Sequence, residues 1–199
     1  MLLELDDNAS VHAAARIARA RLGHQLSEIV PGDRTLLLVW PDGSTVSDIS
    51  ELALERASSE ISDDDAARPE AVVIPVRYDG ADLEAVAAQL ALSSKGVVEL
   101  HSGTVYSVAF VGFSPGFPYL VADAGDEALR LLELPRLATP RTEVPVGSVA
   151  VAAGYCGIYP RSSPGGWNLL GRTDVVLFDA ERAAPALLEP GARVRFEAV

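Results

Sequence analysis

The sequence predicts an α+β protein in two parts: a small N-terminal α+β domain followed by a larger domain that is mostly β. Near the N-terminus, apolar residues recur at helical spacing between short apolar runs. Beyond Gly103, the apolar residues instead form short runs separated by Gly and Pro. An acidic, Ser- and Ala-rich segment separates the two patterns, so we expect domains at residues 1–70 and 71–199.

The N-terminal domain is expected to have the element order β-α-β-β-α. Residues 2–5 are short and apolar, and Asn8 or Ser10 would cap the helix that follows. Strands are expected at residues 26–30 and 35–40, because each apolar run ends at a Pro, Asp and Gly turn. A second helix is expected at residues 49–57 and a linker at residues 58–70, which contain three consecutive Asp.

The C-terminal domain should begin with a strand at residues 71–77 and a helix near residues 82–90. Ser93 would then cap a short helix that reaches His101. The later runs are typical of a β-barrel or sandwich. They contain these apolar residues: Val105, Val108, Phe110, Val146, Val149, Val151, Val175, Leu177, Phe178, Val194 and Phe196.

Composition excludes several classes of protein. The 199 residues carry a formal charge of −12, which disfavours binding to nucleic acid or to anionic membranes. Cys156 is the single cysteine, so the chain forms neither an internal disulfide nor a thiolate metal cluster. No apolar run approaches the roughly 18 residues of a membrane span, and the first residues do not resemble a signal peptide. We therefore expect a cytoplasmic protein.

Two loop regions stand out by composition. Residues 112–120 hold two Gly, two Pro and three aromatic residues directly after a strand, and residues 102–122 contain no charge. Such a loop is either a rigid barrel corner or a surface for a planar ligand, to which Ser114, Gly116, Phe117 and Tyr119 would contribute. Residues 139–173 are similarly rich in Gly and Pro, and residues 144–173 contain no acid. An anionic ligand could approach there.

Three arginines among these turns, Arg141, Arg161 and Arg172, are candidate anion ligands, because a guanidinium binds carboxylate or phosphate bidentately. Gly171 would let a ligand come close to Arg172. The alternative is that these arginines bond only to loop carbonyls. Tyr159 and Trp167 either stack on a ligand or pack beneath the loops. His101 is a candidate catalytic residue or a structural residue at a helix end.

The two loops together carry a family resemblance. The strings Gly-Phe-Ser-Pro-Gly-Phe-Pro-Tyr-Leu at 112–120, Gly-Ile-Tyr-Pro at 157–160 and Gly-Gly-Trp-Asn-Leu-Leu-Gly-Arg at 165–172 resemble the KipI family. This family includes allophanate hydrolase subunit 1, the 5-oxoprolinase subunit PxpB and the carboxyltransferase subdomain of urea carboxylase. The resemblance extends over almost the whole chain. It departs at Tyr155 and Cys156, where Gln-Thr is common, and at residues 79–83, which are shortened.

The resemblance implies a cyclophilin-like β-barrel as the second domain. It also implies a subunit of a heteromeric enzyme that hydrolyses a small amide, either an ATP-dependent 5-oxoprolinase or an allophanate hydrolase. The partners would be the homologous second subunit (KipA, PxpC or allophanate hydrolase subunit 2) and a PxpA-like protein. ATP with Mg²⁺ would act in the complex. The alternatives are a carboxyltransferase that uses biotin and a KipI-like inhibitor of a sensor histidine kinase.

The sequence contains no self-sufficient active site. It lacks a phosphate-binding Gly-x-x-x-x-Gly-Lys loop, a His-Glu-x-x-His zinc motif and a Gly-x-Ser-x-Gly nucleophile elbow. Ser114 and Cys156 have no evident base nearby in the sequence, and no metal site is expected. The sequence therefore predicts an enzyme that a partner completes, with His101, Arg141 and Arg172 as its catalytic candidates. The expected substrate-binding residues are Ser114, Gly116, Phe117, Tyr119, Tyr159, Arg161 and Trp167.

Overall fold

The computed structural model describes residues 1–41, 70–123 and 125–199. It divides into two compact units, Met1–Arg68 (unit 1) and Pro69–Val199 (unit 2), each with its own hydrophobic core. The predicted helix at residues 49–57 and nearly all of the predicted linker at residues 58–70 lie outside the described residues. No helix among the described residues is long and apolar enough to cross a membrane.

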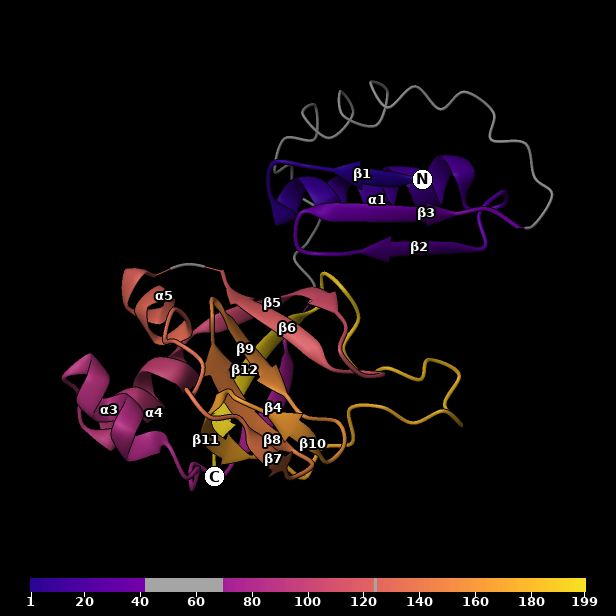
Figure 1. Ribbon diagram of the computed structural model, residues 1–199. Helices are drawn as coiled ribbons and strands as arrows, with labels where there is room; N and C mark the ends of the chain where they lie inside the picture. Colours follow the sequence, from indigo (N-terminus) through magenta and orange to yellow (C-terminus); the bar gives the residue numbers. More distant parts are fainter. Residues whose placement is uncertain (42–69, 124) are drawn as a thin grey trace. The chain divides into compact units, whose positions relative to one another are not determined.

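Unit 1 is a three-stranded antiparallel sheet covered on one face by a helix (Figure 1). Its elements are β1 (Leu2–Glu4), α1 (Asn8–Leu22), β2 (Glu28–Pro31) and β3 (Thr35–Val39), and the strand order is β1-β3-β2. Alternate residues of β3, Leu36 and Leu38, are buried against Val11 and Ala14 of α1. The β-α-β-β order expected from the sequence is confirmed for this part of the chain.

The cap of α1 differs from the prediction. Asp7, rather than Asn8 or Ser10, is the N-cap, and its carboxylate accepts a hydrogen bond of 2.8 Å from the Ser10 backbone N–H. This bond lowers the pKa of Asp7, because it stabilises the charged carboxylate. The Asn8 side chain instead donates to the carbonyls of Gly32 and Asp33 at 3.2 and 3.0 Å, which ties the helix start to the β2–β3 turn.

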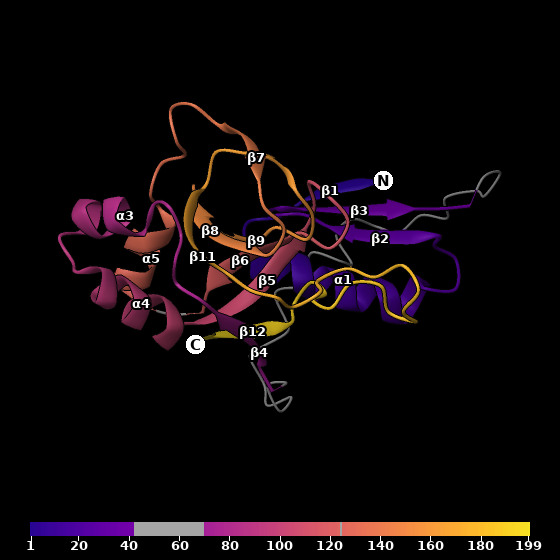
Figure 2. The ribbon, with the colours of Figure 1, turned by 90° about the horizontal axis from the view of Figure 1, so that it is seen from below.

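Unit 2 is built on a seven-stranded sheet that curls into a nearly closed barrel (Figure 1 and Figure 2). The strands run in the order β11-β8-β9-β6-β5-β12-β4. Their bounds are β4 (Val72–Val76), β5 (Val105–Val111), β6 (Pro118–Ala122), β8 (Ser148–Ala152), β9 (Tyr155–Ile158), β11 (Asn168–Arg172) and β12 (Arg193–Ala198). A separate ribbon pairs β7 (Arg141–Val144) with β10 (Ser163–Gly165). The barrel expected from the sequence is confirmed.

Three helices gather on one side of the barrel in both Figure 1 and Figure 2. Helices α3 (Leu83–Leu90) and α4 (Ser94–Gly103) were both expected, and Ser93 caps α4 as predicted, its hydroxyl accepting from the Gly96 N–H at 3.0 Å. Helix α5 (Asp126–Leu132) was not expected, because the chain beyond Gly103 was predicted to be mostly β. Its Leu131 and Leu132 are fully buried in the barrel core, and tertiary burial of this kind stabilises a helix of seven residues.

The barrel closes where the chain beyond β4 pairs with β11. We call residues 77–82 and 169–172 the seam. Arg77 and Arg172 exchange two backbone hydrogen bonds of 2.9 Å, and further along, the N–H groups of Gly80 and Asp82 donate to β11 carbonyls at 3.1 Å. The seam therefore joins the two edges of the sheet. Its hydrogen bonds pair backbone N–H and C=O groups of β11 that an open sheet edge would leave unpaired.

Two glycines allow the backbones of the seam to approach each other. A Cβ on Gly171 would lie 2.9 Å from the Cα of Tyr78 and would overlap the Arg77 carbonyl, and a Cβ on Gly80 would overlap the backbone at Leu169. The space beside Gly171 is therefore filled by the protein's own chain. The expectation that Gly171 admits a ligand is wrong for this reason.

Gly171→Ala should destabilise unit 2, because no flexible side chain can move to make room for the added methyl group. We expect the free energy of unfolding to fall by about 2 kcal/mol, which would lower Tm by roughly 4–8 °C. Gly103→Ala is a matched control, since a Cβ on Gly103 would meet no atom within 4 Å. Thermal unfolding of both variants checks this, and equal Tm values would contradict the role given to the seam glycine.

Candidate functional site

Four of the expected substrate-binding residues meet in one cluster, which we call the aromatic platform: Phe117, Tyr119, Tyr159 and Trp167. The ring centroid of Phe117 lies 5.1 Å from those of Tyr119 and Tyr159 and 5.6 Å from that of Trp167. The ring planes of Tyr159 and Trp167 are nearly perpendicular to that of Phe117, at 89° and 85°, the favourable edge-to-face geometry. The two loop regions singled out in the sequence therefore form one structure.

Glycines on neighbouring strands make room for these rings. A Cβ on Gly157 of β9 would lie 2.9 Å from both Phe117 and Trp167, and a Cβ on Gly165 of β10 would overlap the Tyr159 hydroxyl. Phe117, Tyr159 and Trp167 are almost fully buried, whereas Tyr119 is partly exposed. Packing therefore accounts for most of the ring surface, and even the partly exposed Tyr119 is stacked on Phe110 at a centroid distance of 4.3 Å.

Arg136 lies beside the platform, and the sequence did not mark it as a candidate. Its neighbours are tethered to the platform: the Leu137 N–H donates to the Gly166 carbonyl at 2.7 Å, and the Asn168 amide donates to the Pro135 carbonyl at 3.0 Å. Arg136 itself is exposed and has no ion-pair partner among the described residues.

The Arg136 guanidinium acts electrostatically on two tyrosines of the platform. Burial raises the pKa of Tyr119, and the Arg136 guanidinium partly offsets this rise. Burial and the neighbouring Tyr119 raise the pKa of Tyr159, while Arg136 and Arg141 act in the opposite direction. Both phenols are therefore protonated at neutral pH, and the positive charge of Arg136 acts on both. All three groups can donate hydrogen bonds to an anion.

Arg141 is held by the seam. Its Nη2 lies 2.7 Å from Oδ1 of Asp82, and the other carboxylate oxygen of Asp82 accepts the Leu169 N–H at 2.7 Å. A second, longer bond of 3.4 Å runs from Arg141 Nη1 to the Trp167 carbonyl. Both partners of the ion pair are largely buried. The guanidinium thus binds a carboxylate of its own chain and a loop carbonyl, and its contact with a ligand stays a prediction.

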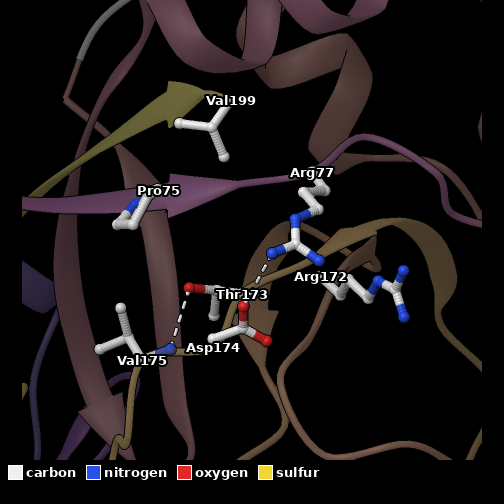
Figure 3. Close-up of a pocket in the computed structure, with 7 residues that line it drawn as sticks. All are labelled: Pro75, Arg77, Arg172, Thr173, Asp174, Val175 and Val199. Carbon is white, nitrogen blue, oxygen red and sulfur yellow. Dashed lines mark hydrogen bonds and ion pairs between the residues drawn. The ribbon is translucent and has the colours of Figure 1, made fainter.

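Arg172 lies apart from the platform, beside a pocket of about 360 Å³ at the seam (Figure 3). Its Nη2 is 2.9 Å from Oδ2 of Asp79, and the neighbouring Arg77 is 3.2 Å from Asp174. In Figure 3 the Arg172 guanidinium points away from the Arg77–Asp174 pair. The pocket is lined by Pro75, Arg77, Arg172, Thr173, Asp174, Val175 and Val199. Because both guanidinium groups face carboxylates, the pocket has little excess positive charge.

The remaining loop candidates occupy different environments. Arg161 is exposed and has no ion-pair partner among the described residues. Gly116 has a positive φ of 77°, and a Cβ there would lie 2.6 Å from that of Phe178, so this glycine is needed for the turn. Ser114 is buried, and its hydroxyl has no hydrogen-bond partner among the described residues.

His101 lies in the barrel core, away from the loops. Its ring is fully buried, with Nδ1 2.7 Å from the Tyr78 hydroxyl and Nε2 3.3 Å from the Cys156 sulfur. The Phe196 ring stacks 4.4 Å from it. Burial lowers the pKa of His101 to about 3 and raises the pKa of the Cys156 thiol, so both groups are uncharged at neutral pH. Through its two hydrogen bonds the fully buried imidazole links α4 to the seam at Tyr78 and to β9 at Cys156.

These contacts limit the chemistry that the described residues can perform. No three His, Cys, Asp or Glu side chains among residues 1–41, 70–123 and 125–199 could hold a metal ion. Cys156 and His101 are within hydrogen-bond distance, but both are buried in neutral form. The described residues do not form a complete set of groups for breaking a covalent bond.

His101 should make the stability of the fold depend on pH. In the unfolded chain the imidazole takes up a proton near its ordinary pKa of 6.5, whereas the folded chain keeps it neutral down to about 3. The unfolded state therefore binds more protons between these values, and stability is lost as pH falls from 6.5 towards 3. When the pH is lowered from 7 to 4.5, the free energy of unfolding should fall in both proteins. We expect this fall to be about 2 kcal/mol smaller in His101→Gln than in the parent protein.

Urea denaturation at the two pH values measures this difference. Tyr78→Phe is the control, since it removes the hydroxyl that contacts Nδ1 but keeps the titrating imidazole. Equal pH dependence of the parent protein and His101→Gln would show that the imidazole is accessible to protons in the folded chain.

Comparison with known proteins assigns the chain to a family. The family model of the carboxyltransferase domain, subdomain C and D, matches residues 2–188. The B-type subunit of 5-oxoprolinase from Escherichia coli O157:H7 is 40% identical over 98% of this chain and 90% of its own length. The protein of the same name from Bacillus subtilis (strain 168) is 35% identical over 95% of this chain and 82% of its own.

Solved structures of similar proteins have the same fold as this chain. The protein TTHA0988 is 36% identical and superposes on the whole of this chain with a TM-score of 0.79, and this chain spans 39% of that longer one. A conserved uncharacterized protein from Pyrococcus horikoshii is 33% identical with a TM-score of 0.60, covering all of this chain and 93% of its own. The Kluyveromyces lactis urea carboxylase, 19% identical with a TM-score of 0.66 over 21% of its chain, shares the fold. The family match over residues 2–188 and the identity of the full-length relatives show that this chain belongs to the carboxyltransferase subdomain C and D family.

Proposed function

We propose that this chain is the B-type subunit of a 5-oxoprolinase, a complex that opens the lactam 5-oxoproline to glutamate with ATP. The observation that carries this proposal is the identity of 40% and 35% with two 5-oxoprolinase subunits of the same type, extending over nearly the whole chain. The likeness to urea carboxylase concerns the fold alone. The match to a carboxyltransferase-domain family is consistent with the alternative of carboxyl transfer from biotin, whereas inhibition of a kinase has no specific observation in its favour.

The platform supports a substrate-binding role for this subunit. 5-Oxoproline has a flat lactam group and one carboxylate. The carboxylate would bind the Arg136 guanidinium and the hydroxyls of Tyr119 and Tyr159, while the lactam lies beside the partly exposed Tyr119. Arg141 is paired with Asp82, so Arg136, which has no ion-pair partner among the described residues, carries the positive charge beside the platform. In a chain of charge −12, this local positive potential would guide an anionic substrate to the platform.

The groups that break the lactam bond would come from the partner subunits. Ring opening requires activation of the lactam carbonyl, attack by water and protonation of the departing nitrogen. No three His, Cys, Asp or Glu side chains among the described residues could hold a metal ion by themselves, and the fully buried His101 offers no accessible imidazole. In this proposal the chain contributes binding and orientation, and the homologous second subunit and the PxpA-like protein complete the reaction.

Reconstitution tests the proposal. The purified chain should show no ATP-dependent release of glutamate from 5-oxoproline, because it lacks the groups for bond cleavage. Activity should appear when the second subunit and the PxpA-like protein of the same organism are added. Glutamate formation and ADP release, measured together, check this. Full turnover by this chain alone, or a reconstituted complex that hydrolyses allophanate and leaves 5-oxoproline intact, would refute the assignment.

Arg136→Gln should weaken substrate binding in the reconstituted complex. Loss of a bidentate charged contact of about 2 kcal/mol would raise KM about thirtyfold and change kcat little. Tm should stay the same, because Arg136 is exposed and makes no described ion pair. Arg130→Gln on α5 is the control for removing one exposed positive charge. If both variants raise KM equally, the effect comes from net charge, and Arg136 is not a carboxylate ligand.

A further inference from the structure

The pocket at the seam, which we call the seam pocket, shares no lining residue with the aromatic platform. Its volume of about 360 Å³ lies in the range of sites that hold small molecules. In Figure 3 its apolar side chains, Pro75, Val175 and Val199, lie on the left, and its charged side chains lie towards the right. The pocket therefore suits a small ligand that has ionic groups and a short aliphatic part.

Two side chains of opposite charge stand together in the wall of the seam pocket. Nη2 of Arg77 is 3.2 Å from Oδ2 of Asp174, and the two side chains are 58% and 85% exposed. Because water screens an ion pair this exposed, the pair contributes little to stability. The contact uses one nitrogen of the guanidinium and one oxygen of the carboxylate, which leaves further donors on Arg77 and a second acceptor on Asp174. The pair can therefore bind an anionic and a cationic group at the same time.

An α-amino acid carries an anionic and a cationic group on one carbon atom, so its two charges lie side by side as those of Arg77 and Asp174 do. The neighbouring Thr173 hydroxyl accepts the Val175 N–H at 3.2 Å, and its own O–H can donate to a ligand carboxylate. A simple anion suits the pocket less well, because Asp174 would repel it. The chemistry of this wall therefore favours a zwitterion.

A second guanidinium group lines the seam pocket apart from the first. Arg172 contacts Oδ2 of Asp79 at 2.9 Å, both side chains being about half exposed, and in Figure 3 its guanidinium points away from the Arg77–Asp174 pair. A ligand that binds both arginines needs a second carboxylate, separated from its first by a short flexible chain. Among the amino acids, glutamate has such a γ-carboxylate, and its two methylene groups would provide the aliphatic part.

We propose that the seam pocket binds L-glutamate, with the α-carboxylate on Arg77, the ammonium group on Asp174 and the γ-carboxylate on Arg172. The inference rests on the proposed function, in which glutamate is the product of ring opening. 5-Oxoproline matches the pocket less well, since its nitrogen is an uncharged lactam N–H and it has one carboxylate. Because the seam pocket and the platform share no residue, the product can bind in the pocket while the substrate occupies the platform.

Isothermal titration of the purified chain with L-glutamate tests the proposal. Arg77→Gln and Asp174→Asn should each raise Kd about tenfold, because each removes one charge-assisted contact with the ligand. Their Tm values should stay close to that of the parent protein, since the ion pair is exposed. Lys95→Gln is the matched control: it breaks another exposed ion pair, the 3.3 Å contact of Lys95 with Glu99 on α4, and should leave Kd unchanged.

Two analogues show which ligand groups the pocket recognises. Glutarate lacks the ammonium group and L-alanine lacks the γ-carboxylate, so each should bind about tenfold more weakly than L-glutamate. Arg172→Gln should raise Kd for L-glutamate and leave Kd for L-alanine unchanged. Equal Kd values for L-glutamate and either analogue, or an unchanged Kd in Asp174→Asn, overturn the proposal. Binding that Arg136→Gln abolishes and Arg77→Gln preserves also overturns it, since the ligand would then occupy the platform.

Turnover of 5-oxoproline by the reconstituted complex judges the proposed function separately. If the complex forms glutamate from 5-oxoproline but the free chain does not bind L-glutamate, only the seam pocket is refuted. If the chain binds L-glutamate with the expected pattern of variants but the complex leaves 5-oxoproline intact, only the proposed function is refuted.

Discussion

Closing the barrel brings the backbones of residues 77–82 and 169–172 into direct contact, and this contact organises the loops of unit 2. The contact is possible because both segments carry a glycine where they approach each other. Asp82, at the end of the seam, starts α3, accepts the Leu169 N–H and holds Arg141. One carboxylate thus connects a helix, an edge strand and the β7–β10 ribbon. The platform depends on this connection, since Trp167 directly precedes β11 and its carbonyl contacts Arg141.

Local patterns in the sequence were sufficient for most of the fold. Alternation and helical spacing located the strands of unit 1, α1, β4, α3 and α4, and turn residues marked their ends. Two details depended on contacts that no local pattern contains. Helix α5 is only seven residues long and is stabilised by burying Leu131 and Leu132 in a core contributed by distant strands. Asp7 rather than Asn8 caps α1, because Asn8 bonds to a turn 24 residues away.

The sequence identified the loops that form the site, but it did not show which charged residues pair with one another. Gly, Pro and aromatic density identified the loops whose rings form the platform. The charge partners lie far away in the sequence: Arg141 pairs with Asp82, 59 residues upstream, and Arg172 pairs with Asp79. Arg136 stands in a segment without a motif, and only its tethers to Gly166 and Asn168 bring it to the platform. His101 was placed correctly at the end of a helix, but its burial depends on Tyr78, Cys156 and Phe196 from three other elements.

The position of β12 in the sheet has a consequence for how the protein folds during synthesis. This strand pairs parallel with β4 and antiparallel with β5, so it fills the gap between two strands that the ribosome produces much earlier. Its Val194 and Phe196 complete the barrel core. Until residues 193–198 have left the exit tunnel, the strand that lies between β4 and β5 is missing. The apolar residues that β12 covers then remain open to solvent. The core of unit 2 is therefore complete only once its last strand has been made, whereas the described strands of unit 1 all precede residue 40.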